Sequence, residues 1–229
     1  MLEALRGRRA VRRVWALDER LAATVRERAG GVPVEIADAG ALERLCGSPS
    51  HQGLVGEADP YPYAHAEALL DGDQALVVAL DRIQDPQNLG AVCRSAETAG
   101  AAGVVVPERQ AAEITPAVCR ASAGAVEHLP VARVRNLADY LAQAKKAGAW
   151  VYGADAGASR SYTEVDWEGR CVLVLGSEGK GLRPRVREAC DDLLAVPLLG
   201  RIDSLNVSAT AAVLLYEAVR SRAASKAGT

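Results

Sequence analysis

The sequence predicts an α/β protein built on a parallel sheet that helices cover on both faces, with a smaller α/β module before it. From Ala75 onward, short apolar segments alternate with helical patterns across short loops, as in parallel strands joined by crossover helices. The 229 residues are 49% hydrophobic, which is enough for a buried core. Near residue 58 the composition changes to an acidic stretch with two prolines, which divides the chain into two parts.

The first part, residues 1–58, has the pattern of a small α/β module. Its apolar spacing predicts, in order, a strand over 11–17, a capped helix over 18–29, a strand over 32–37 and a helix over 38–46. Residues 59–73 are rich in acids, proline and glycine, which predicts a linker with a short helix near its end. We expect the second domain to span residues 74–229.

The second part alternates between strand and helix throughout. The expected elements are strand 75–80, helix 88–99, strand 103–106, helix 116–123, strand 129–134, helix 137–147, strands 150–153 and 171–175, helix 184–189, strand 193–198 and helix 205–224. In such sheets ligands bind beyond the carboxyl ends of the strands. The strands that end at Leu80, Leu175 and Leu198 are each followed by a polar loop. We therefore expect these three loops to converge on one site.

Composition excludes several classes of protein. No apolar run is long enough for a membrane span, and the Arg-rich start is not followed by the apolar region of a secretion signal. The five cysteines are odd in number and scattered without a C-x-x-C pair, which argues against a disulfide framework and against a zinc site. We therefore expect a cytoplasmic protein that needs no metal and contacts no membrane.

The net charge of −2 hides an uneven distribution. Residues 1–30 carry eight arginines and four acids, whereas residues 31–81 carry one arginine and nine acids. A basic N-terminal segment is suited to RNA phosphates, although a solvated Arg-rich helix face is the plain alternative. We slightly favour RNA binding, with Arg8, Arg9, Arg12 and Arg13 as the candidate contacts.

The stretch 196–208 predicts a strand end, a tight polar loop and the start of a long apolar helix. Ser204, Asn206 and Ser208 fall where the helix begins, so their side chains can cap free backbone N–H groups. The same N–H groups can bind a carboxylate of a ligand. A plain helix cap and a ligand site are about equally supported by the spacing.

A glycine-rich loop follows the strand that ends at Leu175, with the sequence Gly-Ser-Glu-Gly-Lys-Gly over residues 176–181. Its glycines allow the backbone to approach a ligand closely. It is not a phosphate-binding P-loop, because Lys180 is followed by Gly181 and not by Ser or Thr. The spacing also fails the dinucleotide fingerprint, so a simple strand-to-helix turn is the remaining alternative.

The first of the three loops leads into a helix that carries Asn88, Gly90 and Arg94. Asn88 and Arg94 lie six residues apart, a little under two helical turns, and Gly90 offers a close approach between them. An arginine beside an asparagine and a glycine suits a phosphodiester or a carboxylate. The alternative is an exposed pair between Arg94 and Glu97, which stabilises a helix little.

Taken together, three blocks of sequence resemble the three motifs of the SpoU class (TrmH family) of SPOUT RNA ribose 2′-O-methyltransferases. The blocks are Asn88-x-Gly90-x-x-x-Arg94, residues 176–181, and Pro197-Leu-Leu-Gly-Arg-Ile-Asp-Ser-Leu-Asn-Val-Ser208. Their order and spacing are highly specific, and the similarity extends from His51 to Arg222. His51-Gln52-Gly53 also resembles a junction in the RlmB subgroup, which methylates a guanosine of bacterial 23S rRNA. His51 itself, with no partner at metal spacing, is assigned no chemistry.

The resemblance implies a SPOUT fold, in which the parallel sheet ends in a C-terminal trefoil knot, and a homodimer with the active site near the subunit interface. It also implies that residues 1–58 form an L30e-like RNA-binding domain. Relatives in this subgroup usually have an extra apolar segment before the stretch that here starts at Leu2, so we expect a first strand to be missing at the start.

The resemblance further implies that the chain binds S-adenosylmethionine and methylates RNA. The cofactor-binding residues would be Leu175, Gly176, Val196, Leu198, Ile202 and Leu205. By matched motif position, the catalytic residues would be Asn88, Arg94, Glu178, Ser204 and Asn206.

The expected roles follow from the chemistry of an in-line methyl transfer to a 2′-hydroxyl. A guanidinium stays protonated in proteins, so Arg94 is expected to clamp an RNA phosphate and stabilise a developing alkoxide, while a phosphate oxygen or water takes the proton. Asn88 and Asn206 would orient the hydroxyl and Arg94. Glu178 would hold the loop or Arg94, and Ser204 would cap the helix and touch the substrate.

Several alternatives remain open at this point. The modified nucleotide could belong to tRNA, or to rRNA as in antibiotic-resistance methyltransferases. The protein could also be a non-catalytic RNA-binding assembly factor, or an α/β enzyme acting on a small nucleotide. The complete motif residues argue against the assembly factor, and the Arg-rich N-terminal module argues against the small-nucleotide enzyme.

Overall fold

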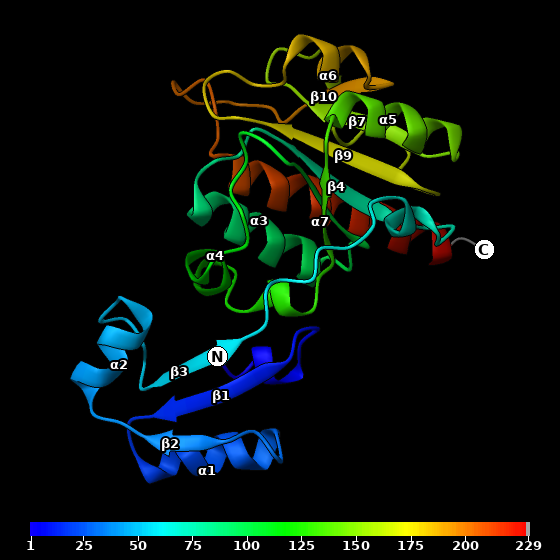
Figure 1. The fold of residues 1–229 in the computed structure, drawn as a ribbon. Helices are drawn as coiled ribbons and strands as arrows, with labels where there is room; N and C mark the ends of the chain where they lie inside the picture. Colours follow the sequence, from blue (N-terminus) through cyan, green and yellow to red (C-terminus); the bar gives the residue numbers. More distant parts are fainter. Residues whose placement is uncertain (228–229) are drawn as a thin grey trace. The chain divides into compact units, whose positions relative to one another are not determined.

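The computed structural model describes residues 1–227 and divides the chain into two compact units, Met1–Pro62 and Tyr63–Thr229 (Figure 1). Each unit contains its own sheet. The break lies at Pro62, within the segment that the sequence analysis assigned to a linker.

The first unit is a three-stranded sheet with two helices. The strand order is β2-β1-β3, with β1 parallel to β2 and antiparallel to β3. Asp18 and Asp38 cap the helices by accepting hydrogen bonds from backbone N–H groups in the first turn. The elements are the 3₁₀ helix η1 (Ala4–Arg6), β1 (Val11–Ala16), α1 (Glu19–Arg28), β2 (Val34–Ile36), α2 (Ala39–Cys46) and β3 (Leu54–Ala58).

The strand β3 was not predicted, because the segment Leu54–Ala58 is short and Gly56 interrupts its apolar pattern. Gly56 lies against Met1, and a Cβ added to Gly56 would come within 2.2 Å of the Met1 sulfur. The strand is held by its antiparallel pairing with β1, which is a long-range contact. It extends the first unit into the region where the sequence pattern indicated only a junction.

The second unit is built on a seven-stranded sheet with the order β6-β5-β4-β9-β7-β10-β8, in which every pair is parallel. The strands are β4 (Leu76–Asp81), β5 (Gly103–Pro107), β6 (Val131–Val134), β7 (Trp150–Ala154), β8 (Arg160–Ser161), β9 (Cys171–Gly176) and β10 (Asp192–Ala195). The predicted fold class, a parallel sheet in an α/β protein, is confirmed.

Helices cover both faces of this sheet, as predicted (Figure 1). The helices α5 (Leu137–Lys146) and α6 (Pro184–Glu188) lie on one face, and α3 (Pro86–Thr98), α4 (Pro116–Ala121) and α7 (Val207–Ala227) lie on the other. Two 3₁₀ helices, η2 (Glu67–Leu70) and η3 (Ala125–Glu127), complete the unit. No helix among residues 1–227 is both long enough and apolar enough to cross a membrane.

The core of the second unit is formed by the central strands and the helices packed on them. All residues of β4 are buried, and their neighbours in β9 are buried up to Leu175. On the α7 face, Leu214 and Leu215 have no exposed surface, and each buried leucine stabilises the fold by about 1.5–3 kcal/mol. This packing explains the apolar character of the C-terminal helix pattern.

The chain departs from the predicted elements at the carboxyl edge of the sheet. The strand β10 ends at Ala195, three residues earlier than expected, since Pro197 has no N–H to donate to a strand partner. The helix α7 starts at Val207, two residues later than expected. Residues 196–206 therefore form an irregular loop by which the chain crosses from β10 to α7, in the region where the resemblance places the knot.

Residues 63–73 are ordered against the second unit. The backbone N–H of Ala64 donates to the carbonyl of Val131, and the leucines of η2, Leu69 and Leu70, are only 5% and 6% exposed. The short helix expected near the end of the linker is confirmed as η2.

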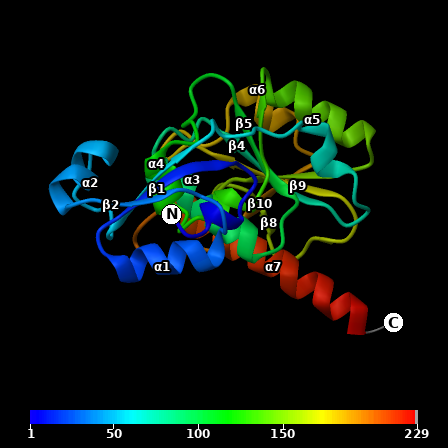
Figure 2. The same cartoon turned by 60° about the horizontal axis from the view of Figure 1, so that its bottom comes forward.

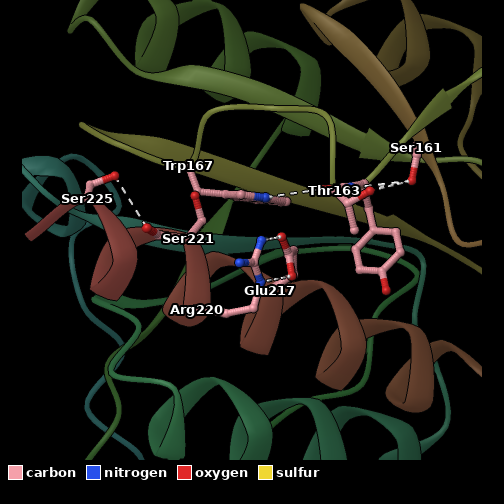
Figure 3. A network of polar contacts seen from close by, with 8 residues as sticks. Ser161, Thr163, Trp167, Glu217, Arg220, Ser221 and Ser225 are labelled. Atoms are coloured by element: carbon pink, nitrogen blue, oxygen red, sulfur yellow. Dashed lines mark hydrogen bonds and ion pairs between the residues drawn. The ribbon is translucent and has the colours of Figure 1, made fainter. Parts of the chain in front are cut away.

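The far end of α7 is fastened to the loop before β9. Figure 3 shows residues 161–167 beside α7, with the fully buried Trp167 donating to the carbonyl of Tyr162 at 3.3 Å. Arg222 of α7 donates to the backbone carbonyls of Trp167, Gly169 and Gln74 at 2.6–2.9 Å. The helix runs the length of the unit (Figure 2), so this anchor also positions its first turn at the opposite edge of the sheet.

Candidate active site

Side chains from three loops meet at the carboxyl edge of the second sheet. Asn88 comes from the first turn of α3, Glu178 from the loop after β9, and Asn206 from the residue before α7. The Asn206 Nδ2 atom donates to Asn88 Oδ1 at 3.0 Å and to Glu178 Oε1 at 2.5 Å. The Asn88 Nδ2 atom donates to the same Glu178 oxygen at 3.1 Å. The expected convergence of the three loops is thus present in the structure.

Asn206 also caps the long helix. Its Oδ1 atom accepts hydrogen bonds from the backbone N–H of Ser208 at 2.8 Å and from the Ser208 hydroxyl at 2.6 Å. Ser204 does not cap α7, contrary to the role expected for it, because the helix begins three residues later. The Ser204 hydroxyl is exposed and lies 3.4 Å from a carboxylate oxygen of Asp203.

The glycine-rich loop is closed on itself so tightly that side chains are excluded. A Cβ on Gly176 would lie 2.2 Å from the carbonyl carbon of Gly181, which is a backbone atom that cannot move aside. The N–H of Gly181 donates to the carbonyl of Ser177 at 2.8 Å, and Gly181 has a φ of +62°. The loop is therefore a built structure and not a simple strand-to-helix turn.

The loop is tied to the neighbouring strand by an ion pair. Arg183 donates from its backbone N–H and from Nε to the two oxygens of Asp81, at 2.8 and 2.7 Å. The Asp81 carboxylate is fully buried, so this charge-assisted contact compensates its desolvation. Asp81 and Gly176 are also paired residues in the β4–β9 register.

A cavity of about 530 Å³ lies beside the three-loop cluster. Its apolar walls come from strand ends and from the irregular loop, and its polar wall is the glycine-rich loop with Glu178. Of the six expected cofactor-binding residues, the five that line this cavity are Leu175, Gly176, Val196, Leu198 and Leu205. Ile202 is not among the lining residues, and its side chain is 75% exposed.

The structure adds an ion pair to this cavity that the sequence analysis missed. Asp155 and Arg187 both line it, and Arg187 Nε donates to Asp155 Oδ2 at 2.9 Å. This hydrogen bond, together with that from the backbone N–H of Gly157, lowers the pKa of Asp155. Asp155 directly follows β7, so its position after a strand end was the signal that could have identified it.

Arg94 is separate from the hydrogen-bonded cluster. Six residues correspond to about 240° around a helix axis, so Asn88 and Arg94 project from different sides of α3. Arg94 is exposed, and its side chain forms no hydrogen bond or ion pair within residues 1–227. The alternative pair with Glu97 is not formed, so the guanidinium is free for a ligand.

Gly90 has a different purpose from the one expected. A Cβ at Gly90 would lie 2.4 Å from the Ala121 Cβ and 2.8 Å from the backbone nitrogen of Ser122. The glycine thus allows α3 to pack closely on the end of α4 and is buried there. The expectation that it provides a close approach between Asn88 and Arg94 is wrong.

The candidate RNA-binding arginines of the first unit lie on β1 and just before it. Arg12 forms an ion pair with Asp59 at 2.6 Å, which raises the Arg12 pKa, and Arg13 pairs with Glu35 at 3.3 Å. Arg13 also stacks over the Trp15 ring at 5.7 Å. Arg8 is exposed and Arg9 is half-buried. Two of the four arginines are therefore already neutralised by acids of their own unit.

Comparisons with known proteins match both units. The model of the SpoU rRNA Methylase family matches residues 75–216, and the model described as RNA 2′-O ribose methyltransferase substrate binding matches residues 1–64. YacO of Bacillus subtilis, named as a TrmH family tRNA/rRNA methyltransferase, is 35% identical over 232 residues, which cover 97% of this chain and 93% of that protein.

Solved structures give the same relationship. The SpoU methyltransferase AviRb from Streptomyces viridochromogenes has a TM-score of 0.84 at 26% identity, over 97% of this chain and 86% of that one. An rRNA methyltransferase from Sinorhizobium meliloti, solved with AdoMet bound, has a TM-score of 0.81 at 27% identity, over 96% of this chain and 84% of that one.

Proposed function

The chain belongs to the SpoU rRNA methylase family, and we propose that it transfers the methyl group of S-adenosylmethionine to a ribose 2′-hydroxyl of RNA. The observation that carries this proposal is the hydrogen-bonded cluster of Asn88, Glu178 and Asn206 at the wall of the 530 Å³ cavity. The cluster supplies polar groups for a hydroxyl, and the cavity supplies a pocket for a cofactor of nucleoside size.

The lining of the cavity suits S-adenosylmethionine. Leu175, Leu198 and Leu205 offer apolar surface for an adenine ring, and the glycine-rich loop offers backbone groups for its polar edge. The AdoMet-bound rRNA methyltransferase from Sinorhizobium meliloti supports this assignment. When bound, the cofactor supplies a methyl group on a sulfonium.

The cluster positions the reacting groups through the contacts that hold it together. Each of the two asparagine amides keeps one further hydrogen or lone pair after its contacts within the cluster, and Glu178 Oε2 is also available. We assign Asn88 and Asn206 to orienting the ribose hydroxyl and Glu178 to holding both amides in place. Ser204, which lines the cofactor cavity, is assigned a contact with substrate or cofactor.

Arg94 is assigned to the RNA phosphate next to the target ribose. Its guanidinium is exposed and has no partner within the described part of the chain, and a planar fork of donors matches a phosphate. Since the guanidinium does not release its proton, Arg94 stabilises the developing alkoxide, and a phosphate oxygen or water accepts the proton.

The proposed substrate is a guanosine of 23S rRNA, recognised within folded RNA. The match of residues 1–64 to a substrate-binding model supports an RNA-binding role for the first unit, for which we retain the L30e-like assignment. Division of labour between a binding unit and a catalytic unit suits a large RNA, which proteins recognise by shape, phosphates and unpaired bases.

We also propose a homodimer that shares the face of α7. Tyr216 and Val219 are 51% and 37% exposed on a helix whose other apolar residues are buried, and Leu199 is 99% exposed in the loop before it. Light scattering at micromolar protein should give the mass of two chains. A monomer mass would contradict the dimer.

Mapping of ribose methylation tests the proposed function. Total RNA from cells with and without the gene should differ at one 2′-O-methylated guanosine of 23S rRNA, and the purified protein should restore that methyl group with S-adenosylmethionine. A lost methyl group in tRNA would move the protein to the tRNA-modifying enzymes. No difference in either RNA, together with RNA binding, would make it a non-catalytic assembly factor.

Replacement of Arg94 separates RNA contact from cofactor binding. We expect Arg94→Ala to abolish methyl transfer while S-adenosylmethionine binding, measured by calorimetry, stays nearly unchanged. Arg94→Lys should also fail, because a point charge does not replace a bidentate fork. Normal turnover in the Lys variant would contradict the clamp.

A further inference from the structure

The second unit contains a larger cavity that the proposed methyl transfer does not use. Its volume is about 1240 Å³, and it lies where η2, the start of α5 and the start of α6 surround the ends of β4, β5 and β6 (Figure 1). Six arginines line it, against two acids, Glu67 and Asp139. The six are Arg82, Arg109, Arg133, Arg135, Arg183 and Arg185, and we call this cavity the arginine groove.

The arginine groove contains polar atoms that lack a partner. Among the described residues, the side-chain atoms that are buried without any hydrogen bond are Arg82 Nε and Tyr140 Oη, and both residues line the groove. Buried donors without partners are costly and rare in proteins, so two of them at one cavity indicate that a ligand supplies the acceptors.

The backbone at this site is strained. Arg82 has a φ of +65° and Gln110 a φ of +60°, which is the left-handed region that residues with a Cβ avoid. Both residues line the groove. Strain of this kind is retained where it places a side chain for binding, and here it places a charged guanidinium.

Two of the arginines shape the walls, and the others are free to bind. Arg183 is held by the buried Asp81, and Arg133 lies over the Tyr63 ring at 5.2 Å and near Glu113 at 3.4 Å. Within residues 1–227, the side chains of Arg109, Arg135 and Arg185 form no hydrogen bond or ion pair, and all three are exposed. The groove therefore presents uncompensated positive charge on a preformed surface.

We propose that the arginine groove binds the phosphodiester backbone of the RNA strand that flanks the methylated nucleotide. This proposal rests on the proposed function. The volume exceeds the range of about 300–1,000 Å³ that is usual for small-ligand pockets, which favours a polymer. Arginine forks match phosphates bidentately, and Arg82 Nε and Tyr140 Oη would donate to phosphate oxygens.

The position of the groove supports a flanking strand. Leu182 lines the cofactor cavity and Arg183, the next residue, lines the arginine groove. The two cavities thus lie on opposite sides of the glycine-rich loop, which the Arg183–Asp81 ion pair fixes. A strand held in the groove would deliver an adjacent nucleotide to the cluster of Asn88, Glu178 and Asn206.

The test compares two double variants of the full chain. Arg109→Ala/Arg185→Ala removes two exposed arginines of the groove, and Arg120→Ala/Lys146→Ala removes the same charge from exposed positions that line neither cavity. The probe is a fluorescently labelled single-stranded RNA of mixed sequence, titrated at several salt concentrations. The slope of log affinity against log salt should flatten by about 1.4–1.8 in the groove variant, from about 0.7–0.9 for each lost phosphate contact.

The proposal is overturned if both double variants change the salt slope equally, or if the groove variant keeps the affinity of the wild-type protein. Inorganic phosphate at the same phosphate concentration should compete weakly. Equal competition would assign the groove to a small anion and overturn the RNA assignment.

Arg82→Gly provides a second, independent variant. Glycine tolerates the positive φ, so we expect the melting temperature to stay the same or rise while RNA binding weakens. A fall in melting temperature with wild-type RNA affinity would assign Arg82 to the fold and contradict its role in the groove. Methyl transfer by the wild-type protein to 23S rRNA is measured alongside, since its failure would reject the proposed function and leave the binding result interpretable.

Discussion

At the scale of single residues, one carboxylate oxygen holds the candidate site together. Glu178 Oε1 accepts hydrogen bonds from Asn88 and Asn206, which belong to different helices. We expect Glu178→Ala to reduce kcat/KM by about 100-fold or more, because both amides lose their common acceptor. Glu178→Gln keeps an acceptor oxygen and should retain more activity. Equal activity of the Ala variant and the wild-type protein would show that the cluster is not needed.

Asp155 allows a prediction about pH. Its pKa is lowered by the hydrogen bond from Arg187, so the stabilisation is present above the unfolded value of about 3.9 and is lost as pH falls through the lower folded value. Affinity for S-adenosylmethionine should therefore show no Asp155-dependent loss between about pH 7 and 5, and should fall in stronger acid. Calorimetry on Asp155→Asn is the control, because this variant should lack the acid-dependent step. An Asp155-dependent loss of affinity near neutral pH would contradict the assigned pKa direction.

At the scale of elements, the contact between α3 and α4 determines where Asn88 lies. Gly90→Ala places a Cβ within 2.8 Å of the Ser122 backbone nitrogen, so the two helices must separate. We expect a loss of about 1–3 kcal/mol in unfolding free energy and a loss of methyl transfer. Thermal unfolding followed by circular dichroism measures the first effect.

Gly40→Ala is a matched control for that substitution. Gly40 lies within α2, and its Cβ would meet only the ends of the Asp38 and Arg44 side chains, at 3.3 and 3.4 Å. This variant should be as stable as the wild-type protein or more stable, by about 0.4–1 kcal/mol. If both variants lost the same stability, the close helix packing at Gly90 would not be the cause.

At the scale of the whole molecule, the two units separate binding from chemistry. The fragment 63–229 contains the complete parallel sheet, both cavities and the Asn88–Glu178–Asn206 cluster. We expect it to fold and to bind S-adenosylmethionine like the full chain. Its RNA affinity should fall, and its salt dependence should decrease without vanishing, because the arginine groove remains. Unchanged RNA affinity of the fragment would contradict an RNA contact by residues 1–62.

Local patterns in the sequence were sufficient for most elements and for the three loops of the site. Apolar periodicity depends on nearby residues, so it identified the strands and helices of the second unit within a few residues. Glycine and capping residues marked the loop ends, because their conformational preferences are local. The loops that contain Asn88, Glu178 and Asn206 were therefore expected to converge before any contact was known.

The tertiary structure decided what depends on residues far apart in the chain. The hydrogen bonds of the cluster join positions 28 to 118 residues apart, and β3 and β8 are strands only because partners pair with them. The purpose of Gly90, the Asp155–Arg187 pair and the arginine groove likewise depend on which elements the crossovers bring together. A local pattern carries no information on such contacts, because strand order and helix packing are set by the burial of the whole chain.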